Sequence, residues 1–564
     1  MTALDDFFTS FWRRHPVTAT FAGEHTHDAL LPDWSPAGLE STITDLRAQR
    51  TALAAEQRAA ASTLGSAAWP EIAPLVDLRL AGATVAIELS ERTGAHFHRG
   101  NPSLAVGEAV FGVISLMIRE FAPLHQRIAS ATARLLATPA FLAGARASIT
   151  RPIPRSWAER AQRECDGAVL LLDGGISRWL ASAPVEPALA GALRDAAGPA
   201  TAAFDDFATW LRGGAQLDDN GQIGCGAEML DAMIAIGHAC DTPRAELLAD
   251  AHQRFASALG ALAGMAIALA PGGWTEVQAQ LADDHPTLDE YLPAFGSCRD
   301  ACRAKAEKHD VVTWPEAHLR FAPTPEWTRD AAPLLYYLPY RCPPPLEPTS
   351  MHTHAVPPVD DGIAPAEQER RLRITNHSVI KLNHVVHHAA IGHHVQNWYA
   401  ARSASRVGRV AAVDGASRIA MFCGGSLAEG WACYATDVMT ELGFCTPLER
   451  VAEQHTTVRM LARTIVDIEL HQGTMTLDEA AAFYAERALM PAAAARAEAV
   501  KNSMFPGAAL MYWLGTDGVH RLRVERALAE GTAFSLRTFH DTLLGFGAIP
   551  VSMIAALMNG RAIA

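Results

Sequence analysis

Apolar positions recur along most of this chain at intervals of three and four residues, the spacing that places side chains on one face of an α-helix. One clear helix start is Ser35, a suitable N-terminal cap that is followed by Pro36 at the first helical position. Alternating apolar and polar positions with tight hairpin turns, which would indicate half-buried strands, are nearly absent. Further alanine- and leucine-rich helical stretches are expected at 68–93, 154–183, 185–213 and 242–270.

Two interruptions of the helical pattern indicate how the chain is divided. A stretch rich in glycine and aspartate at 211–230 predicts an N-terminal helical portion over 1–215 and a C-terminal helical portion over 216–564. Residues 315–365 contain twelve of the 33 prolines and cannot be helical. A long irregular segment in a compact protein usually forms a cleft wall or a lid. We therefore predict an all-α, two-lobed helical protein with a deep central cleft.

Composition and charge narrow the possible partners. Apolar residues make up 49% of the 564 residues and charged residues 19%, which is typical of an ordered globular protein. The net charge of −14 argues against binding to nucleic acid or to anionic lipid. No apolar run approaches the length of a membrane span, no secretory signal is evident, and the nine cysteines are scattered. We expect a cytoplasmic protein that binds neither nucleic acid nor membrane, of unknown oligomeric state.

Residues 384–394 carry five of the 23 histidines. A single histidine on an amphipathic helix usually packs or caps, but five together favour a metal site or a proton-handling site, because neutral imidazole is the commonest metal ligand. On a straight helix, His387 and His394 would share a face but lie about 10 Å apart along the axis. One shared ion therefore needs a break in the helix, and Gly392 is where a break could occur.

A further ligand is expected from a carboxylate. Glu429 lies in "SLAEGWACYATDV" (426–438) and would open a helix. Its position next to glycine and tryptophan is equally compatible with a solvated acid in the first helical turn, where the helix dipole favours negative charge.

Several motifs resemble those of the family called domain of unknown function 885. "HHAAIGHHVQ" (387–396) is similar to the family pattern H-E-A-x-P-G-H-H-L-Q, and "EGWACYAT" (429–436) is similar to E-G-W-A-L-Y-A-E. The segments 11–36, 463–480 and 506–515 also resemble the family, so the likeness spans nearly the whole chain. Members of this family are helical proteins that resemble zinc peptidases of the gluzincin type.

The resemblance implies roles for individual residues. His387, His393 and Glu429 match the metal ligands, although His394 could replace His393, and His384 or His388 could also bind. The likeness further implies that Arg463, Asp467 and His471 line the cleft. We therefore predict His388, His471 and Lys501 as catalytic residues, Arg463, Tyr512 and His394 as substrate-binding residues, and His387, His393 and Glu429 as metal ligands.

Two departures from the family pattern bear on the reaction. His388 stands where the family has the glutamate that acts as general base in H-E-x-x-H enzymes. Lys501 and Asn502 stand where the family has arginine and tyrosine, so a hydroxyl suited to stabilising an oxyanion is missing at 502 while the positive charge is kept. His388 could itself be the base, or it could be an additional ligand.

These features together predict a metal-dependent, hydrolase-like enzyme on a peptidase-like scaffold, acting on a small acidic or amide-containing molecule. One divalent ion is expected, zinc first, although extra histidines favour copper, nickel, cobalt or iron at least as well. Lyase or redox chemistry stays open. The alternatives are a metallopeptidase that uses His388 as its base and a non-catalytic metal-binding protein.

Overall fold

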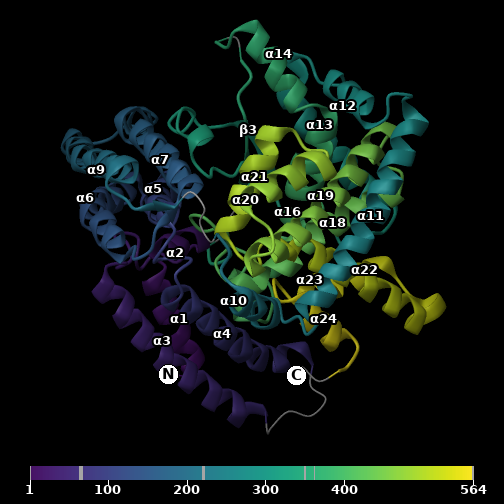
Figure 1. The fold of residues 1–564 in the computed structure, drawn as a ribbon, viewed down its shortest axis with the longest axis horizontal. Coiled ribbons are helices and arrows are strands. Elements are labelled where there is room, and N and C mark those ends of the chain that lie inside the picture. Colours follow the sequence, from purple (N-terminus) through teal and green to yellow (C-terminus); the bar gives the residue numbers. More distant parts are fainter. Residues whose placement is uncertain (1, 62–67, 219–222, 348–350, 361, 562–564) are drawn as a thin grey trace.

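The computed structural model describes residues 2–61, 68–218, 223–347, 351–360 and 362–561, and helices make up nearly all of its regular structure (Figure 1). The prediction of an all-α protein is therefore confirmed. The predicted two-lobed division and deep cleft stay a prediction.

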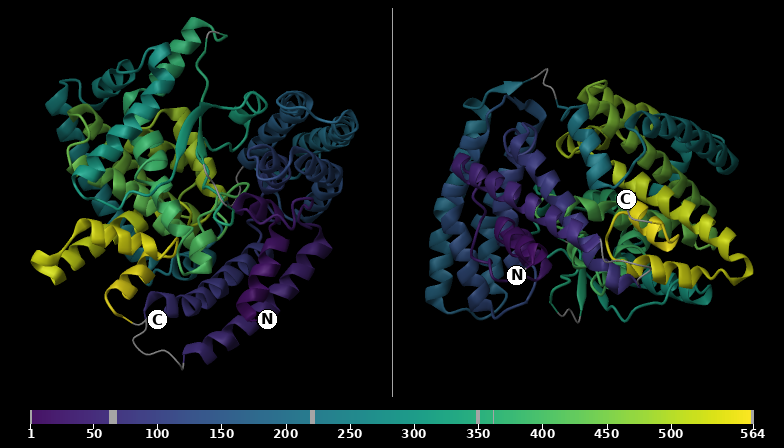
Figure 2. Two further views of the ribbon diagram at one scale, coloured as in Figure 1. Left: turned by 180° about the vertical axis from the view of Figure 1, so that it is seen from behind. Right: turned by 90° about the horizontal axis from the view of Figure 1, so that it is seen from below.

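The N-terminal part is a set of long helices. The helix pair α3 and α4 packs together, and a bundle forms from α5, α6, α7 and α9. This bundle, drawn in blue, lies to one side of the green and yellow C-terminal helices in every view (Figures 1 and 2). The bounds are α1 (Ala3–Arg14), α2 (Pro16–Ala22), α3 (Pro36–Ala61), α4 (Trp69–Thr93), α5 (Pro102–Met117), α6 (Leu124–Ser148), α7 (Arg155–Leu170), α8 (Ile176–Ala181) and α9 (Pro187–Gly213).

The C-terminal part is built around two helix pairs, α11 with α19 and α18 with α22. Its helices are α10 (Ala227–Ala232), α11 (Arg244–Leu269), α12 (Trp274–Asp283), α13 (Leu288–Lys308), α14 (Pro365–Ile374), α15 (His377–Val379), α16 (His393–Ala400), α17 (Arg406–Val410), α18 (Gly425–Glu441), α19 (Pro447–Gln472), α20 (Leu477–Ala482), α21 (Ala492–Met504), α22 (Leu510–Glu530), α23 (Leu536–Gly545) and α24 (Val551–Met558).

Short irregular elements interrupt these helices. Wide π-helical turns occur at η1 (Leu171–Gly175), η2 (Met233–Gly237), η4 (Ile380–Ala389) and η6 (Phe483–Arg487), and tight 3-10 turns at η3 (Ala332–Leu334), η5 (Phe422–Gly424) and η7 (Gly531–Ala533). Two small parallel sheets, which were not expected, pair β1 (Ile153–Pro154) with β2 (Leu217–Asp218) and β3 (Leu319–Pro323) with β4 (His352–Val356).

Several helices begin and end close to the positions predicted from the sequence. Pro36 is the first residue of α3, and the Ser35 hydroxyl accepts a hydrogen bond of 3.1 Å from the backbone N–H of Gly38. The helices α4, α9 and α11 begin and end within two residues of the expected bounds. The stretch expected at 154–183 is helical but contains the π-helical turn η1.

The proline-rich segment 315–365 is irregular, as its composition requires. Its residues 348–350 and 361 lie outside the described part of the chain. The ladder between β3 and β4 holds its two ends together. Tyr336, Leu338 and Tyr340 from this segment line a cavity, in keeping with the expected role as a wall.

By length and composition, α6 could cross a membrane, and α11 with α12 would pass the same test as a bent pair. In this fold α6 packs against α5 and α9 as a core helix of the bundle. Its Arg134 is fully buried and donates to the backbone oxygens of Leu30, Gly112 and Pro16.

The close crossing of α18 and α22 depends on two glycines. A Cβ added to Gly430 would collide with the backbone of Gly515, and one added to Gly515 would collide with the carbonyl oxygen of Ser426. The two helix backbones can therefore approach closely only without side chains at these positions. This crossing fixes the helix that carries Glu429.

Candidate metal centre

The histidine-rich segment is not a straight helix. From Ile380 to Ala389 the backbone forms the π-helix η4, and it leaves the helical conformation at Ala390 and Gly392 before α16 begins at His393. A Cβ at Gly392 would collide with the carbonyl oxygen of His387, so only glycine allows the chain to fold back this tightly. The break expected near Gly392 is therefore present.

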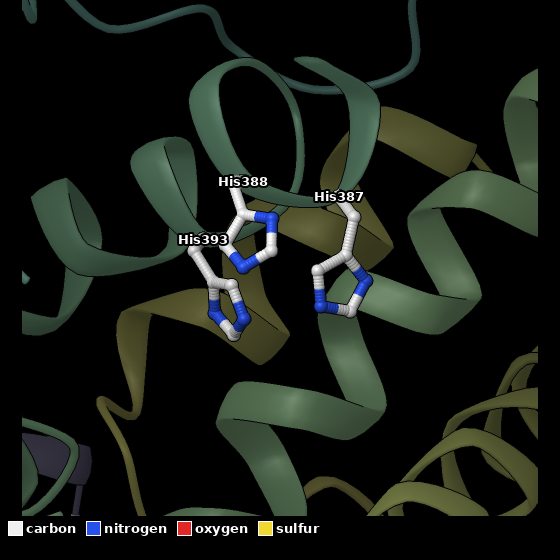
Figure 3. A group of neighbouring side chains, drawn as sticks. All are labelled: His387, His388 and His393. Carbon is white, nitrogen blue, oxygen red and sulfur yellow. The ribbon is translucent and has the colours of Figure 1, made fainter. Parts of the chain in front are cut away.

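This break brings three imidazoles together. His387 and His388 come from η4 and His393 from the first turn of α16, and their rings point toward one another (Figure 3). One nitrogen from each lies within 4.8 Å of the others. The spacing of six residues between His387 and His393, which a regular helix would place on different faces, is thus made convergent by the break.

Glu429, from α18, lies beside two of these imidazoles. Its Oε2 lies 3.4 Å from His387 Nε2 and 3.5 Å from His393 Nε2. These separations exceed those of strong hydrogen bonds, and this oxygen is buried without a hydrogen-bond partner among the described residues. Neighbouring ligands of a tetrahedral ion, each about 2.1 Å from it, lie about 3.4 Å apart. The donor set therefore fits a divalent transition metal.

Glu429 lies in the second turn of α18, so the expectation that it opens the helix was wrong. The indole N–H of the fully buried Trp431 donates to the carbonyl oxygen of Ile391 at 2.9 Å. This bond ties the helix of Glu429 directly to the break between η4 and α16, and so fixes the carboxylate relative to the histidines.

Hydrogen bonding and burial set the protonation of the group. His388 Nδ1–H donates to the carbonyl oxygen of Asn383 at 2.7 Å, which leaves the lone pair on Nε2. Burial holds the pKa of His388 well below its usual value and also lowers the pKa of His387. Burial would lower the pKa of His393 too, but the neighbouring Glu429 carboxylate raises it overall.

The pKa of the Glu429 carboxyl is shifted downwards by the same neighbours. Burial would raise the pKa of Glu429, but the imidazoles of His393 and His387 together hold it well below its usual value. The Glu429 carboxylate therefore favours its ionised form, and it also favours the protonated form of His393. A cation bound between them would satisfy the same negative charge.

The group faces a cavity of about 820 Å³. Its wall combines residues from the N-terminal part, the proline-rich segment and the C-terminal helices. Among the charged and phenolic residues of the wall are Glu88, Glu91, Tyr336, Tyr340, Arg418, Glu453, Arg459, Arg463, Glu498, Lys501 and Tyr512.

Three residues predicted to contact substrate or take part in catalysis lie on this wall. Arg463 Nε donates to Glu498 Oε1 at 2.7 Å, and its guanidinium lies 4.7 Å from the centre of the Tyr512 ring. Lys501 Nζ lies 5.6 Å from the centre of the Tyr336 ring. Arg463, Tyr512 and Lys501 are therefore placed where a molecule in the cavity would meet them.

His394 points elsewhere. Its Nε2 lies 3.2 Å from the carbonyl oxygen of Ala317 and its Nδ1 lies 3.4 Å from the Tyr340 hydroxyl, and the residue is only 3% exposed. Both ring nitrogens are thus occupied by the protein. The structure does not support His394 as a substrate-binding residue or as a replacement for His393, because successive residues of α16 face different directions.

His471 and Asp467 also lie away from the cavity wall. His471 is fully buried, with Nε2 2.9 Å from the carbonyl oxygen of Asn502 and Nδ1 accepting from the backbone N–H of Cys225. Asp467 accepts from the backbone N–H groups of Gly507 and Leu510. The predicted catalytic role of His471 is therefore corrected to a structural one, since both of its ring nitrogens form hydrogen bonds to backbone groups.

Two wall residues were missed in the sequence. Gln396 is 1% exposed, and both polar atoms of its amide lack hydrogen-bond partners among the described residues. It follows His393 by three residues, so a shared helix face could have indicated it. Arg459 precedes Arg463 by one helical turn and could have been found in the same way.

A second set of histidines packs behind the centre. His352 and His354 lie on β4, and His354 Nε2 lies 3.2 Å from His384 Nδ1. The His354 ring is also in contact with the ring of His388. This set supports the histidine-rich segment from the side away from the cavity.

A family model described as bacterial protein of unknown function (DUF885) matches residues 16–558. The chain belongs to this family. No curated protein matches it. A candidate lipoprotein of unknown function from Shewanella oneidensis has a similar structure, with 21% identity, a TM-score of 0.75 and 99% of each chain covered. A candidate lipoprotein from Colwellia psychrerythraea has 15% identity, a TM-score of 0.73 and the same coverage.

Likeness at this level of identity shows a shared fold. The description of these two relatives as lipoproteins refers to those proteins, and the cytoplasmic location of this chain stays a prediction. The same holds for its oligomeric state and for the expectation that it binds neither nucleic acid nor membrane.

Proposed function

We propose that this protein is a metal-dependent, hydrolase-like enzyme that holds one divalent ion with His387, His388, His393 and Glu429. The observation that carries the proposal is the convergence of three imidazoles, two of which, on His387 and His393, lie within 3.5 Å of a buried carboxylate oxygen of Glu429 that has no hydrogen-bond partner among the described residues. Such an oxygen is costly to bury unless a cation or a donor compensates it. A bound divalent ion would polarise a substrate carbonyl or activate water.

Zinc is the first candidate, and the nitrogen-rich donor set suits other transition metals as well. Zinc is commonly held by imidazole and carboxylate donors in tetrahedral sites. Three imidazoles also suit copper, nickel, cobalt or iron, and geometry and availability decide among them in the cell.

The position of His388 favours a role as a metal ligand over a role as a general base. Its Nδ1–H is fixed on the Asn383 carbonyl, which leaves the lone pair on Nε2 for an ion, and one nitrogen of His388 lies within 4.8 Å of a nitrogen of His387 and of His393. A nitrogen that binds the ion cannot also take a proton from water. This supports an activity other than general peptide hydrolysis on a scaffold that resembles the gluzincin peptidases.

The cavity supports a small substrate with acidic or amide groups. A volume of about 820 Å³ lies in the range of small-molecule sites. Lys501 and Arg463 offer positive charge to an acidic group. The buried amide of Gln396, whose polar atoms lack partners among the described residues, lies behind the same wall.

The deciding experiment is metal analysis of the protein purified without added metal. We expect about one divalent ion per chain, and about a tenfold or greater loss of metal affinity in His387→Ala and in Glu429→Ala. His309→Ala, at an exposed position on the surface, serves as the control and should keep its metal. Equal metal content in all four proteins would overturn the ligand assignment.

Turnover assays then separate the alternatives. Chelator-sensitive hydrolysis of small amides that carry a carboxylate would support the proposal. Chelator-sensitive cleavage of casein-derived peptides would instead support a metallopeptidase. Full occupancy with no turnover of either class would indicate a non-catalytic metal-binding protein.

A further inference from the structure

One wall of the cavity carries positive charge that the protein does not neutralise. Arg459 and Arg463 are one turn apart on α19, so both side chains project from the same face of that helix into the cavity. Arg463 is paired with Glu498. Arg459 makes no hydrogen bond or ion pair with any of the described residues, and its Nε is buried without a partner.

Lys501 adds a third cation from α21. Its ammonium group lies over the Tyr336 ring and forms no ion pair within the part of the chain that the structure describes. Glu498 is the one carboxylate that pairs with any of these three cations among the described residues. Its pKa is about 2, since burial, which raises the value, is outweighed by Arg463 and Lys501.

Glu453, the nearby acid on α19, does not offset this charge. Burial, together with Asp437, raises the pKa of Glu453 to about 8, so it is mostly neutral at pH 7. Three cations and one ionised carboxylate leave a net charge of about plus two on the wall. The three cations are only partly exposed, and unpaired charge held away from bulk water is unfavourable, so an anionic ligand would stabilise this wall.

The wall adjoins the candidate metal centre. The Arg463 guanidinium packs against the Tyr512 ring. His387 and Glu429 of the centre line the same cavity as Arg463 and Lys501. An anion bound by the three cations would therefore sit beside the reacting group of a substrate at the metal centre.

We infer that Arg459, Lys501 and Arg463 form an anion subsite that binds an oxyanion of the substrate, either a carboxylate or a phosphate. The fork of an arginine and the ammonium of a lysine both bind such groups through charge-assisted hydrogen bonds. Tyr336 and Tyr512 supply hydroxyl groups on the same wall. The inference deepens the proposed function and rests on it only for the claim that the anion belongs to the substrate of the metal centre.

The test is calorimetric titration of chelator-treated, metal-free protein with glutarate, with inorganic phosphate and with the neutral glutaramide. We expect one glutarate or phosphate to bind per chain, while glutaramide does not bind. The anion that binds more tightly shows whether the subsite prefers a carboxylate or a phosphate. Arg459→Gln and Lys501→Gln should each weaken anion binding by about tenfold or more, the usual effect of removing one charge-assisted hydrogen bond.

Arg450→Gln is the matched control, because Arg450 is an exposed arginine on the same helix and away from the cavity. It should bind the anion as the wild type does. Equal anion binding in the wild type and in both cavity variants, each checked for folding by circular dichroism, would overturn the inference. Failure of both anions to bind the wild type would overturn it as well.

Metal analysis of the same preparations keeps the two proposals apart. If the cavity variants keep their metal but lose anion binding, the result would support both the metal centre and the anion subsite. Anion binding in a wild-type protein that takes up no metal would refute the proposed function and leave the anion subsite standing.

Discussion

His388 is the residue at which this chain departs most from its apparent relatives, and its surroundings suit an imidazole. The carbonyl oxygen of Asn383 accepts from His388 Nδ1–H, and the rings of His387 and His393 lie on its other side. A carboxylate at this position would face a carbonyl oxygen that it cannot bind. The site is therefore built for nitrogen at 388.

We predict that His388→Glu will not create a peptidase, although it restores the H-E sequence. Asn502 would still lack the tyrosine hydroxyl, and loss of one such donor costs on the order of a hundredfold or more in rate. The native reaction should fall sharply, and the metal preference should change as an imidazole is replaced by a carboxylate. Wild type and variant would be compared on casein-derived peptides, with metal content measured in parallel. Strong peptidase activity in the variant would show that the scaffold is still a protease.

The structure brings together the side chains that were named from motifs as metal ligands, and their role as ligands stays a prediction. His387, His393 and Glu429 were chosen from motifs, and Gly392 gave a physical reason for their convergence. The same likeness also suggested His394 and His471, whose ring nitrogens are used by Tyr340, Ala317, Asn502 and Cys225. Which nitrogen is free depends on contacts between distant segments, and one sequence does not contain that information.

At the scale of elements, helix ends could be predicted because capping is local. The Ser35–Pro36 start needs only the next few residues. The π-helix η4 could not be predicted, since local sequence does not separate a π-helical turn from an α-helical one, and the rings of its histidines contact distant segments such as β4. The parallel pairing of β3 with β4 joins segments separated by an irregular proline-rich loop, which local patterns do not reveal.

The crossing of α18 and α22 gives an element-scale prediction. Gly430→Ala places a methyl group against the backbone of Gly515, so the two helices must separate. Overpacking of this kind costs about 1–3 kcal/mol, and the shift of α18 should also weaken metal binding through Glu429. Urea unfolding and metal titration would measure both effects.

Gly264→Ala is the control for this prediction, because a Cβ at Gly264 in α11 has no neighbour within 4 Å. It should leave metal binding unchanged and should stabilise the protein by about 0.5–1 kcal/mol through helix propensity. Unchanged stability and metal affinity in Gly430→Ala would show that the helix crossing is looser than its backbone contact indicates.

At the scale of the whole molecule, histidines are found both at the cavity wall and at buried positions in the core. The cavity wall draws on the N-terminal part, the proline-rich segment and the C-terminal helices, so no single element makes the site. Histidines also fill core positions between these parts, where they hydrogen-bond to backbone carbonyls or to each other. His540, for example, is fully buried between the carbonyl oxygen of Val311 and the hydroxyl of Tyr434.

These buried histidines predict a steep dependence of stability on pH. Burial lowers the pKa of five of them from 6.5 to about 4, namely His238, His384, His394, His471 and His540. Between these values the unfolded chain binds protons that the folded chain does not. Stability should therefore be fully present above pH 6.5 and should be lost as the pH falls toward 4, by up to about 1.4 kcal/mol per pH unit for each histidine. Thermal unfolding of chelator-treated protein across this range would measure the loss without a contribution from metal release.

His540→Gln should reduce the slope of unfolding free energy against pH by about one proton. A melting temperature that stays constant from pH 6.5 to pH 4 would show that these histidines are not held neutral by the fold.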